Sequence, residues 1–412
     1  MNIGINCLRI KPAYVGGVNT FTLGLLEGFL QEGPDHRFQI YIHKANRQFF
    51  KAFTKYPNAE LVDCPLFGPW TYRLSLLPIF SFSTGFFKWA NNTMFGPIAR
   101  LMDKRSDLIY FPSTTLLPYN NTRPTVLSIH DIQQVHFPHY FSWLVRLYRR
   151  ITYGLSVRCA DYIQASSEFI KHDLLSHFTN LREDQVFFIP EGVNIDEFKA
   201  PVDLDQVLAP YRLPERFLFF PGQLWHHKNH ITVLKALKRI RQQHEVEIPL
   251  VMTGVEYPGA RDIFKYVAQH RMDFVHYIGN VPFAVIVALY QKARFHITAV
   301  LYESSSLPIL EAAASGTPII ASKTPPNVEM SRILALNLFE PTDEESLASL
   351  LMDLWENDDL IGEQVEHNNR AIEHYSWRNA ARIYLTQFET ILERGGRVDQ
   401  SSGPRAHDKV QR

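Results

Sequence analysis

The residues of this chain best suited to bind a polar ligand are two glutamates, Glu303 and Glu311, in the segment VLYESSSLPILEAAASGTPIIAS. The apolar run at residues 295–299 predicts a strand, the serines after it predict a loop, and Pro308 suits the first turn of a helix. Glu303 is then expected above the sheet and Glu311 one turn into that helix. Backbone amides at residues 305–307 are left to hold an anion, and carboxylates accept hydrogen bonds from hydroxyls. The pattern favours a ligand with several hydroxyl groups and a phosphate.

A pair of glycines, Gly16 and Gly17, follows the first predicted strand and opens a helical pattern. Paired glycines at a helix start let backbone amides approach a phosphate, which the helix dipole also attracts. Neither G-x-G-x-x-G nor G-x-x-x-x-G-K-[ST] occurs in the chain, so a standard dinucleotide site or P-loop is excluded. On this motif alone, a plain turn is the alternative to a phosphate site.

A histidine–aspartate pair, His130 and Asp131, follows the strand predicted by the apolar run TVLSI. Ionisable residues at the end of a buried parallel strand are a common catalytic arrangement. The alternative is a loop cap, because the chain has 17 histidines and many of them must be incidental.

A third strand-end motif contains Gly222, Gln223 and Lys228 in FLFFPGQLWHHKNH, where a predicted strand runs into a glycine turn. Lys228 stands near the start of the next predicted helix, whose N-terminus adds favourable potential for a phosphate. The alternative is a solvated lysine beside a helix cap formed by Asn229, a residue type common at N-caps.

These motifs belong to a chain in which short apolar, β-rich runs alternate with helical patterns from end to end. Such alternation predicts βαβ units with buried parallel sheets, in two doubly wound domains rather than one large sheet. The predicted strands are residues 3–6, 38–43, 108–111, 126–130, 162–165, 186–189, 217–220, 250–253, 275–278, 295–299 and 318–321.

The break between the domains is predicted near residues 194–213, which are rich in proline and charge and lack periodicity. We expect an N-terminal domain over 1–195 and a second domain over 196–376. A final helix over 377–394 is expected to pack back toward the N-terminal domain. The polar tail, 395–412, is expected to be disordered.

Composition narrows the class of function. The chain has 42 Lys and Arg against 42 Asp and Glu, so its formal net charge is zero and a nucleic-acid partner is not expected. Its three cysteines have no metal-binding spacing, and no metal or cofactor is expected. The first residues do not resemble a signal peptide, and no apolar run is long enough for a spanning helix. These features favour a cytoplasmic protein.

Taken in order, the motifs resemble those of the family-four retaining glycosyltransferases. The resemblance covers nearly the whole chain and includes the glycine pair, SIHDIQQVHFPHYF, ASSEFIKHDL, IPEGVNIDEF, FPGQLWHHKNH, YIGNV and the Glu-x7-Glu spacing of Glu303 and Glu311, followed by Gly316 and Pro318. It implies the α/β GT-B fold, in which two facing Rossmann-like, doubly wound domains enclose an interdomain cleft. It also implies hexose transfer from a nucleoside-diphosphate sugar, of the GDP-mannose or UDP-glucose type, to a glycan or lipid-linked acceptor.

The resemblance implies a role for each motif. Glu303 would contact hydroxyls of the donor sugar, Glu311 the ribose, and Lys228 the diphosphate. His130 would face the sugar and the acceptor, so that His130, Glu303 and Lys228 are the catalytic candidates. The donor-binding candidates are Gly16, Gly17 (whose amide would approach the phosphate), Gly222, Gln223, Lys228, Asn280 and Val281 (whose backbone would contact the base), Ser304, Ser305, Leu307 and Glu311.

Two departures from the family pattern stand out. The family usually has arginine where this chain has Gln223, which is uncharged, so Lys228 would carry more of the leaving-group stabilisation. Two serines, Ser304 and Ser305, stand where the family usually has a glycine-containing loop, so the resemblance does not specify which sugar is bound. A nucleotide-sugar 2-epimerase of similar architecture and a non-catalytic nucleotide-sugar-binding protein are the alternatives. The acidic pair at 203 and 205 matches a metal-binding DxD motif in letters, but it lies in the predicted linker.

Residues 65–95 are unusually aromatic, with nine Phe, Trp and Tyr side chains flanked by Arg73, Lys88 and Arg100. Aromatic side chains with scattered cations suit a membrane interface. They predict peripheral contact with the inner face of the membrane, where a lipid-linked acceptor would be found. The alternative is an ordinary core helix with a loop.

Overall fold

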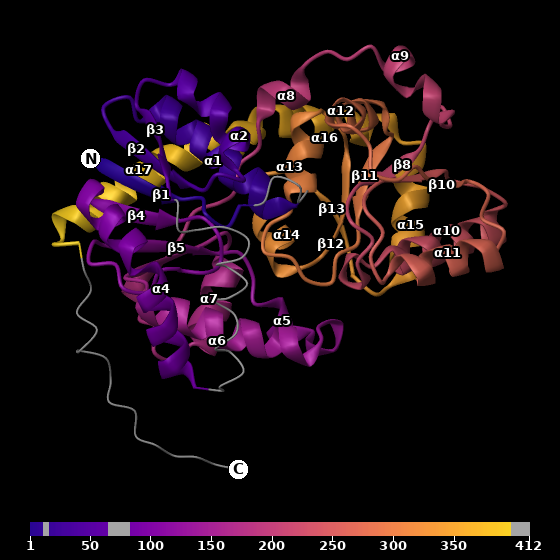
Figure 1. The fold of residues 1–412 in the computed structure, drawn as a ribbon. Coiled ribbons are helices and arrows are strands. Elements are labelled where there is room, and N and C mark those ends of the chain that lie inside the picture. The colour runs from indigo at the N-terminus through magenta and orange to yellow at the C-terminus, as the bar shows by residue number, and fades with distance from the viewer. Residues whose placement is uncertain (11–15, 65–82, 397–412) are drawn as a thin grey trace. The chain divides into compact units, whose positions relative to one another are not determined.

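The computed structural model describes residues 1–10, 16–64 and 83–396. The chain divides into two compact units (Figure 1). Unit 1 contains Met1–Pro190 and Trp377–Arg412, and unit 2 contains Glu191–Ser376. The first unit ends a few residues before the expected boundary at 195, because the Val193 amide donates to the Tyr375 carbonyl (2.7 Å) and so ties this stretch to unit 2.

Unit 1 is built on a parallel sheet with the strand order β3-β2-β1-β4-β5-β6-β7. Helices flank the sheet on both sides (Figure 1). The strands are β1 (Asn2–Asn6), β2 (Arg37–Ile42), β3 (Ala59–Asp63), β4 (Leu108–Phe111), β5 (Thr125–Ile129), β6 (Tyr162–Ala165) and β7 (Val186–Phe188). The helices are α1 (Gly17–Glu32), α2 (Arg47–Phe50), α4 (Thr84–Arg105), α5 (Gln133–His136), α6 (Trp143–Cys159), α7 (Glu168–His177) and α17 (Trp377–Glu393).

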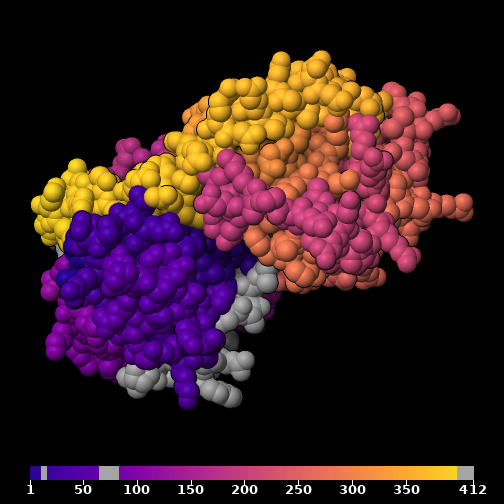
Figure 2. Space-filling model, turned by 90° about the horizontal axis from the view of Figure 1, so that it is seen from above, coloured from indigo at the N-terminus to yellow at the C-terminus, as the bar shows by residue number. Residues whose placement is uncertain are grey.

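The last helix, α17, packs along α1 within unit 1, although nearly the whole chain separates them (Figure 2). Two glycines of α1 make this contact possible. A Cβ at Gly24 would collide with the Trp377 indole, and one at Gly28 would lie 2.5 Å from the Trp377 carbonyl oxygen. Nearby, Glu32 accepts hydrogen bonds from Arg378 (2.5 Å) and Arg382 (2.6 Å). The apolar face of α17 therefore packs against α1, the first helix of the chain.

Unit 2 contains a second parallel sheet with the order β10-β9-β8-β11-β12-β13. Its strands are β8 (Leu218–Phe220), β9 (Leu250–Met252), β10 (Val275–Tyr277), β11 (Phe295–Thr298), β12 (Ile319–Ser322) and β13 (Asn337–Phe339). Its helices are α8 (Ile195–Lys199), α9 (Leu204–Leu208), α10 (His230–His244), α11 (Ala260–Gln269), α12 (Phe283–Lys292), α13 (Leu307–Ala314), α14 (Pro325–Met330), α15 (Glu344–Trp355) and α16 (Asp358–Ala371).

Both faces of the second sheet are covered, which explains why its strands are continuously apolar. Leu218 and Phe220 pack toward α10, α11 and α15, whereas the alternate residue Phe219 packs toward α12 and α13. Side chains alternate between the faces of a strand, so both sets of residues must be apolar when helices cover both sides.

The strands β3 and β13 were not predicted from the sequence, and both are edge strands. β3 reads AELVD and β13 reads NLF, so neither has the apolar run that marks the central strands. Residues 194–213, expected as a linker, instead form α8 and α9 and pack on α13 and α12 of unit 2. Asp203 caps α9 by accepting a hydrogen bond from the Gln206 amide (3.0 Å), which gives the DxD letters a structural role.

The described end of the chain stops just after α17, where the Gly396 amide donates to the Ile391 carbonyl (2.9 Å). Most of the tail predicted to be disordered, residues 397–412, lies outside the described residues. Among the helices that the structure does describe, none is long and apolar enough to cross a bilayer.

Candidate functional site

The candidate site in unit 2 lies where the strand order of the sheet reverses. β8 pairs with β9 on one side and with β11 on the other. Open parallel sheets bind ligands at such a switch point, beyond the carboxyl ends of the strands. Gly222 and Gln223 follow β8, and Glu303 follows β11. The two loops are joined directly, because the Leu301 amide donates to the His227 carbonyl (2.9 Å).

Lys228 and Glu303 form an ion pair at this switch point. The Lys228 Nζ lies 2.6 Å from Glu303 Oε1, and the two side chains are only 17% and 14% exposed. The other carboxylate oxygen, Glu303 Oε2, is buried and has no hydrogen-bond partner among the described residues. A buried acceptor of this kind is suited to a hydroxyl group of a ligand.

Lys228 is held at the start of α10 by an unusual backbone turn. Asn229 has a left-handed conformation (φ 58°), and its side chain makes no capping bond to the helix. Instead, its Nδ2 donates to the Pro341 carbonyl (2.7 Å), and its Oδ1 accepts from the Thr232 hydroxyl (2.9 Å). Lys228 is therefore paired and largely buried, unlike the solvated lysine beside a capping asparagine that the sequence left open.

Glu311 lies within α13, where its Oε2 accepts a hydrogen bond from the Tyr290 hydroxyl (2.8 Å). Burial raises the pKa of Glu311 to about 7, while the Tyr290 hydrogen bond and the positive charge of Lys228 act in the opposite direction. Burial and the neighbouring carboxylate also raise the pKa of Tyr290 well above its ordinary value, so its hydroxyl remains a donor. Glu311 is thus a carboxyl group whose charge changes near neutral pH.

The serine loop before α13 places the first amides of that helix beside Glu303. Ser304 and Ser305 precede Ser306, the N-cap residue, and Leu307 is the first residue of the helix. The first amides of a helix have no acceptor within it. The Ser306 hydroxyl is buried, makes no capping bond and has no partner among the described residues. This loop therefore offers polar groups to an anionic or hydroxylated ligand.

The two residues expected to contact a base, Asn280 and Val281, follow β10 at the edge of the sheet. The preceding Gly279 is left-handed (φ 75°), and its carbonyl accepts from the Gly254 amide (2.8 Å). Asn280 is exposed, and Val281 packs partly on the apolar core. Like Gly222 and Glu303, these two residues follow the carboxyl end of a strand of this sheet, but their strand, β10, is two positions away from β8.

The glycine turn after β8 is shaped by contacts that the sequence did not reveal. Gly222 has φ 128°, a conformation that side chains rarely adopt, and open space surrounds its missing Cβ. The next residue, Gln223, accepts a hydrogen bond at Oε1 from the Trp225 indole Nε1 (3.0 Å). Trp225 in turn stacks on Tyr257 with ring centroids 4.0 Å apart. Trp225 lies within the FPGQLWHHKNH motif, but the sequence assigned no role to it, to Tyr257 or to Tyr290, because aromatic side chains in such patterns are usually core.

Unit 1 holds the remaining candidates. Gly16 is the N-cap of α1, and Gly17 is the first residue of that helix. His130 follows β5 and is buried, and its Nε2 donates to the Pro112 carbonyl (2.9 Å), since a carbonyl can only accept. Its ring packs edge-on against Phe21 of α1, with centroids 4.7 Å apart. Phe21 therefore links His130 to the helix that the glycine pair begins.

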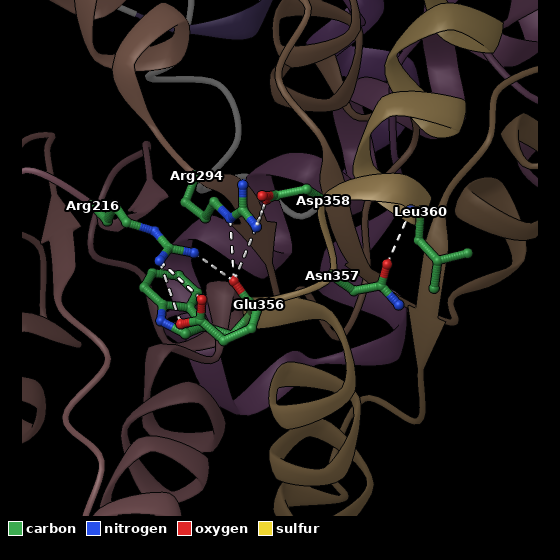
Figure 3. Close-up of polar contacts among 7 residues, drawn as sticks. Arg216, Arg294, Glu356, Asn357, Asp358 and Leu360 are labelled. Atoms are coloured by element: carbon green, nitrogen blue, oxygen red, sulfur yellow. Dashed lines mark hydrogen bonds and ion pairs between the residues drawn. The ribbon is translucent and has the colours of Figure 1, made fainter.

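A second polar cluster lies at the amino ends of the unit 2 strands, opposite the candidate site, and its role is structural (Figure 3). Arg216 and Arg294, which precede β8 and β11, both donate to the carbonyl of Trp355 at the end of α15. They also pair with Glu356 (3.0 Å) and Asp358 (2.5 Å). A hollow of about 460 Å³ beside them is lined by Asp353, Glu356, Asn357, Asp358 and Asp359. The arginines satisfy the last carbonyl of a helix and neutralise this acidic surface, so we assign it no ligand.

Two family models match the chain, and together they cover most of it. Glycosyltransferase Family 4 matches residues 15–197, and Glycosyl transferases group 1 matches residues 210–374. The chain belongs to the group 1 glycosyltransferases. The first matched region contains the glycine pair and His130. The second contains the strand-end residues of unit 2.

Relatives of this glycosyltransferase include several mannosyltransferases. O-antigen chain mannosyltransferase B of Escherichia coli is 24% identical over 69% of this chain and 75% of that protein. The MMP alpha-(1->4)-mannosyltransferase of Mycolicibacterium hassiacum is 30% identical over 54% of this chain and 52% of that protein.

Solved structures agree on the fold of this glycosyltransferase. Anabaena HepE, solved in complex with UDP and glucose, has a TM-score of 0.69 at 17% identity, covering 95% of this chain and 100% of that chain. Sucrose-phosphate synthase from Thermosynechococcus elongatus has a TM-score of 0.70 at 19% identity, covering 95% and 99%. The fold is GT-B, as the family resemblance implied.

Proposed function

We propose that this glycosyltransferase moves a hexose from a nucleoside-diphosphate sugar, of the GDP-mannose or UDP-glucose type, to a glycan or lipid-linked acceptor, with retention at the anomeric carbon. The observation that carries the proposal is the largely buried Lys228–Glu303 pair at the switch point of unit 2. It sets a cation for phosphate beside a carboxylate for sugar hydroxyls. Relatives named as mannosyltransferases and a structural neighbour solved with UDP-glucose support a donor of this class.

In this proposal the donor extends along the carboxyl edge of the unit 2 sheet. Lys228 and the N-terminus of α10 bind the diphosphate, with Gly222 and Gln223 beside it. Glu303 accepts hydrogen bonds from the sugar, and its unpartnered Oε2 supplies a second acceptor. Glu311 binds the ribose, and the backbone at Asn280 and Val281 contacts the base. The amides of Ser304, Ser305 and Leu307 add donors near the sugar and phosphate.

The reaction breaks the bond between the anomeric carbon and the diphosphate oxygen and forms a bond from that carbon to an acceptor hydroxyl, whose proton is released. Negative charge grows on the leaving diphosphate. Lys228 and the α10 N-terminus are preorganised to stabilise that charge, which is the work a divalent cation does in other transferases. We therefore propose a metal-independent reaction. Retention, the contact of His130 with sugar and acceptor, and the approach of the Gly17 amide to the phosphate rest on the family resemblance.

We also propose that unit 1 contacts the cytoplasmic face of a membrane. Residues 65–82 of the aromatic segment lie outside the described residues, but α4 begins just beyond them. There Trp89 is 62% exposed and stacks on the exposed Phe86, although Phe87 and Phe95 are buried. α6, which contacts α4, begins with an exposed apolar run led by Trp143 (62%), and exposed arginines follow at 146 and 150. Exposed aromatics with basic neighbours match an anionic lipid surface.

A donor panel tests the proposed reaction. The protein is incubated with UDP-glucose, GDP-mannose and related donors, with and without a lipid-extract acceptor, in EDTA or with Mn²⁺. We expect sugar transfer from one donor, undiminished by EDTA, and an NMR spectrum showing the donor's anomeric configuration in the product. Conversion of the donor to its 2-epimer without an acceptor would favour the epimerase instead. Loss of turnover in EDTA that Mn²⁺ restores would contradict metal independence, and an inverted product would contradict retention.

A further inference from the structure

The diphosphate loop of this chain contains an uncharged residue, Gln223, whose amide can face a ligand in two ways. Its NH₂ group donates and its carbonyl oxygen only accepts. A carbonyl oxygen turned toward a phosphate would be repelled, whereas the NH₂ group would bind. An arginine in the same place needs no such control, because every polar atom of a guanidinium is a donor.

We propose that Trp225 is a positioning residue that fixes this choice, so that the Gln223 amide presents its NH₂ group to the phosphates of the donor. The inference rests on the proposed nucleoside-diphosphate donor. An indole Nε1–H can only donate, so the amide atom 3.0 Å from it must be the carbonyl oxygen Oε1. The contact therefore determines which end of the amide is turned toward the indole and which is turned away.

The indole is itself held in place from the neighbouring loop. Trp225 stacks on Tyr257 with ring centroids 4.0 Å apart and planes 19° apart. The loops behind these rings touch backbone to backbone: a Cβ at Gly254 would collide with the Gly222 carbonyl, and one at Gly259 would lie 2.7 Å from the Leu224 carbonyl oxygen. The Leu224 amide also donates to the Val255 carbonyl (3.1 Å). The loop after β9 thus supports the loop after β8, and Tyr257 is its contact with Trp225.

The inference is tested by making the same Trp225 substitution in two proteins, one with Gln223 and one with Gln223→Arg. Calorimetry with UDP, GDP and ADP as probes measures nucleotide affinity in each. Trp225→Phe keeps a ring on Tyr257 but removes the indole N–H. With Gln223 present, we expect it to weaken binding of the preferred diphosphate about 2- to 10-fold, the range for one neutral hydrogen bond. In the Gln223→Arg background, which has no side-chain acceptor to orient, the same substitution should change affinity less than about twofold. Gln223→Arg alone should bind at least as tightly as the unaltered protein, because it adds a positive charge.

Tyr257 supplies matched controls for the stacking contribution. Tyr257→Phe preserves the ring and should leave affinity unchanged, whereas Tyr257→Ala should reproduce the loss seen in Trp225→Phe only when Gln223 is present. Melting temperatures within error of the unaltered protein show that each variant is folded. Equal weakening in both backgrounds, or none in either, overturns the positioning role. If the unaltered protein binds none of the diphosphates, the proposed donor class fails and the inference falls with it.

Discussion

Lys228 Nζ and Glu303 Oε1 lie 2.6 Å apart although 75 positions separate the two residues in the chain. Their loops meet because β8 and β11 are neighbours in the sheet. Without ligand, each charge neutralises the other in a largely buried setting, which limits the cost of removing both from water. In the proposed complex, the donor places its phosphate beside the cation and its sugar hydroxyls beside the anion, so that both charges gain a further partner.

Replacing Lys228 by alanine should lower kcat about 10²- to 10³-fold, the typical value of one preorganised donor to a developing negative charge. The KM for a neutral acceptor should change little, because the charge matters most in the transition state. Steady-state kinetics with the preferred donor measures both. Lys235→Ala, an exposed lysine within α10, the helix that follows Lys228, is the matched control and should be neutral. Near-normal turnover of Lys228→Ala would mean that another group stabilises the leaving diphosphate.

Glu303→Gln should separate sugar recognition from nucleotide binding. A neutral amide accepts more weakly than a carboxylate, so kcat/KM should fall about 10- to 100-fold, as expected for hydrogen bonds to a charged group. Affinity for the free nucleoside diphosphate should be kept or increased, because Lys228 is released from its partner. Calorimetry with the diphosphate and with the intact donor distinguishes the two effects. An equal loss for both ligands would place Glu303 on the nucleotide rather than on the sugar.

Nucleotide affinity should depend on pH through Glu311. If Glu311 binds the ribose as proposed, its ionised carboxylate is the form that accepts the hydroxyl hydrogen bonds. Burial raises the pKa of Glu311 to about 7. Binding should therefore strengthen as the pH rises toward 7, by up to about tenfold per pH unit, and level off above it. The effect on folding has the opposite sign: the raised pKa means that the folded state binds the proton more tightly, so the contribution to stability falls between the ordinary pKa of 4.5 and about 7.

Two variants isolate that titration. Glu311→Gln should remove the part of the pH dependence due to this residue, leaving the titration of the nucleotide phosphate itself. Tyr290→Phe removes the hydroxyl that lowers the pKa of Glu311, so its binding profile should shift to higher pH. Calorimetry of UDP or GDP from pH 5.5 to 8.5 would record both. Identical profiles for the unaltered protein and Glu311→Gln would contradict the assignment.

The docking of α17 on α1 predicts a stability effect in unit 1. Gly28→Ala would bring a Cβ within 2.5 Å of the Trp377 carbonyl oxygen, and backbone cannot yield as a side chain can. We expect a loss of about 1–3 kcal/mol, the usual cost of overpacking, measured by thermal or urea denaturation. Gly154→Ala in α6 is the control, because an added Cβ there would have no atom of a neighbouring element within 4 Å, and it should be neutral or stabilising by about 0.4–1 kcal/mol. Equal stability of the two variants would mean that α17 is not docked as described.

Membrane contact should depend on the exposed aromatics of α4 and α6. Trp89→Ala with Trp143→Ala should reduce co-sedimentation with vesicles containing anionic lipid, because both rings are largely exposed. Raising the salt concentration should weaken binding of the unaltered protein as the charge attraction is screened. Phe283→Ala, an exposed aromatic of unit 2, is the control and should bind like the unaltered protein. If the folded protein binds no vesicles at low salt, it does not contact membranes through this surface.

Local patterns in the sequence determined much of this protein. The central strands are apolar because helices cover both faces of each sheet, so runs such as LFF in β8 and FHIT in β11 were recognisable. Glu311 could be placed near the start of a helix because Pro308 and the serine loop mark that start over a few residues. The edge strands β3 (AELVD) and β13 (NLF) were missed because their apolar runs are very short and are bounded or interrupted by polar residues.

Only the tertiary structure decided which distant residues meet. The sequence does not state that β8 lies beside β11, and that pairing alone brings Lys228 to Glu303. The Tyr290–Glu311 hydrogen bond and the stack of Trp225 on Tyr257 likewise join separate elements. Tyr290, Trp225 and Tyr257 were not marked as functional because an aromatic side chain has the same local pattern whether it fills a core or orients a polar neighbour. The spacing of apolar and polar residues along the chain determines the helices and strands. Contacts between these elements depend on strand order and packing, which residues far apart in the chain determine together.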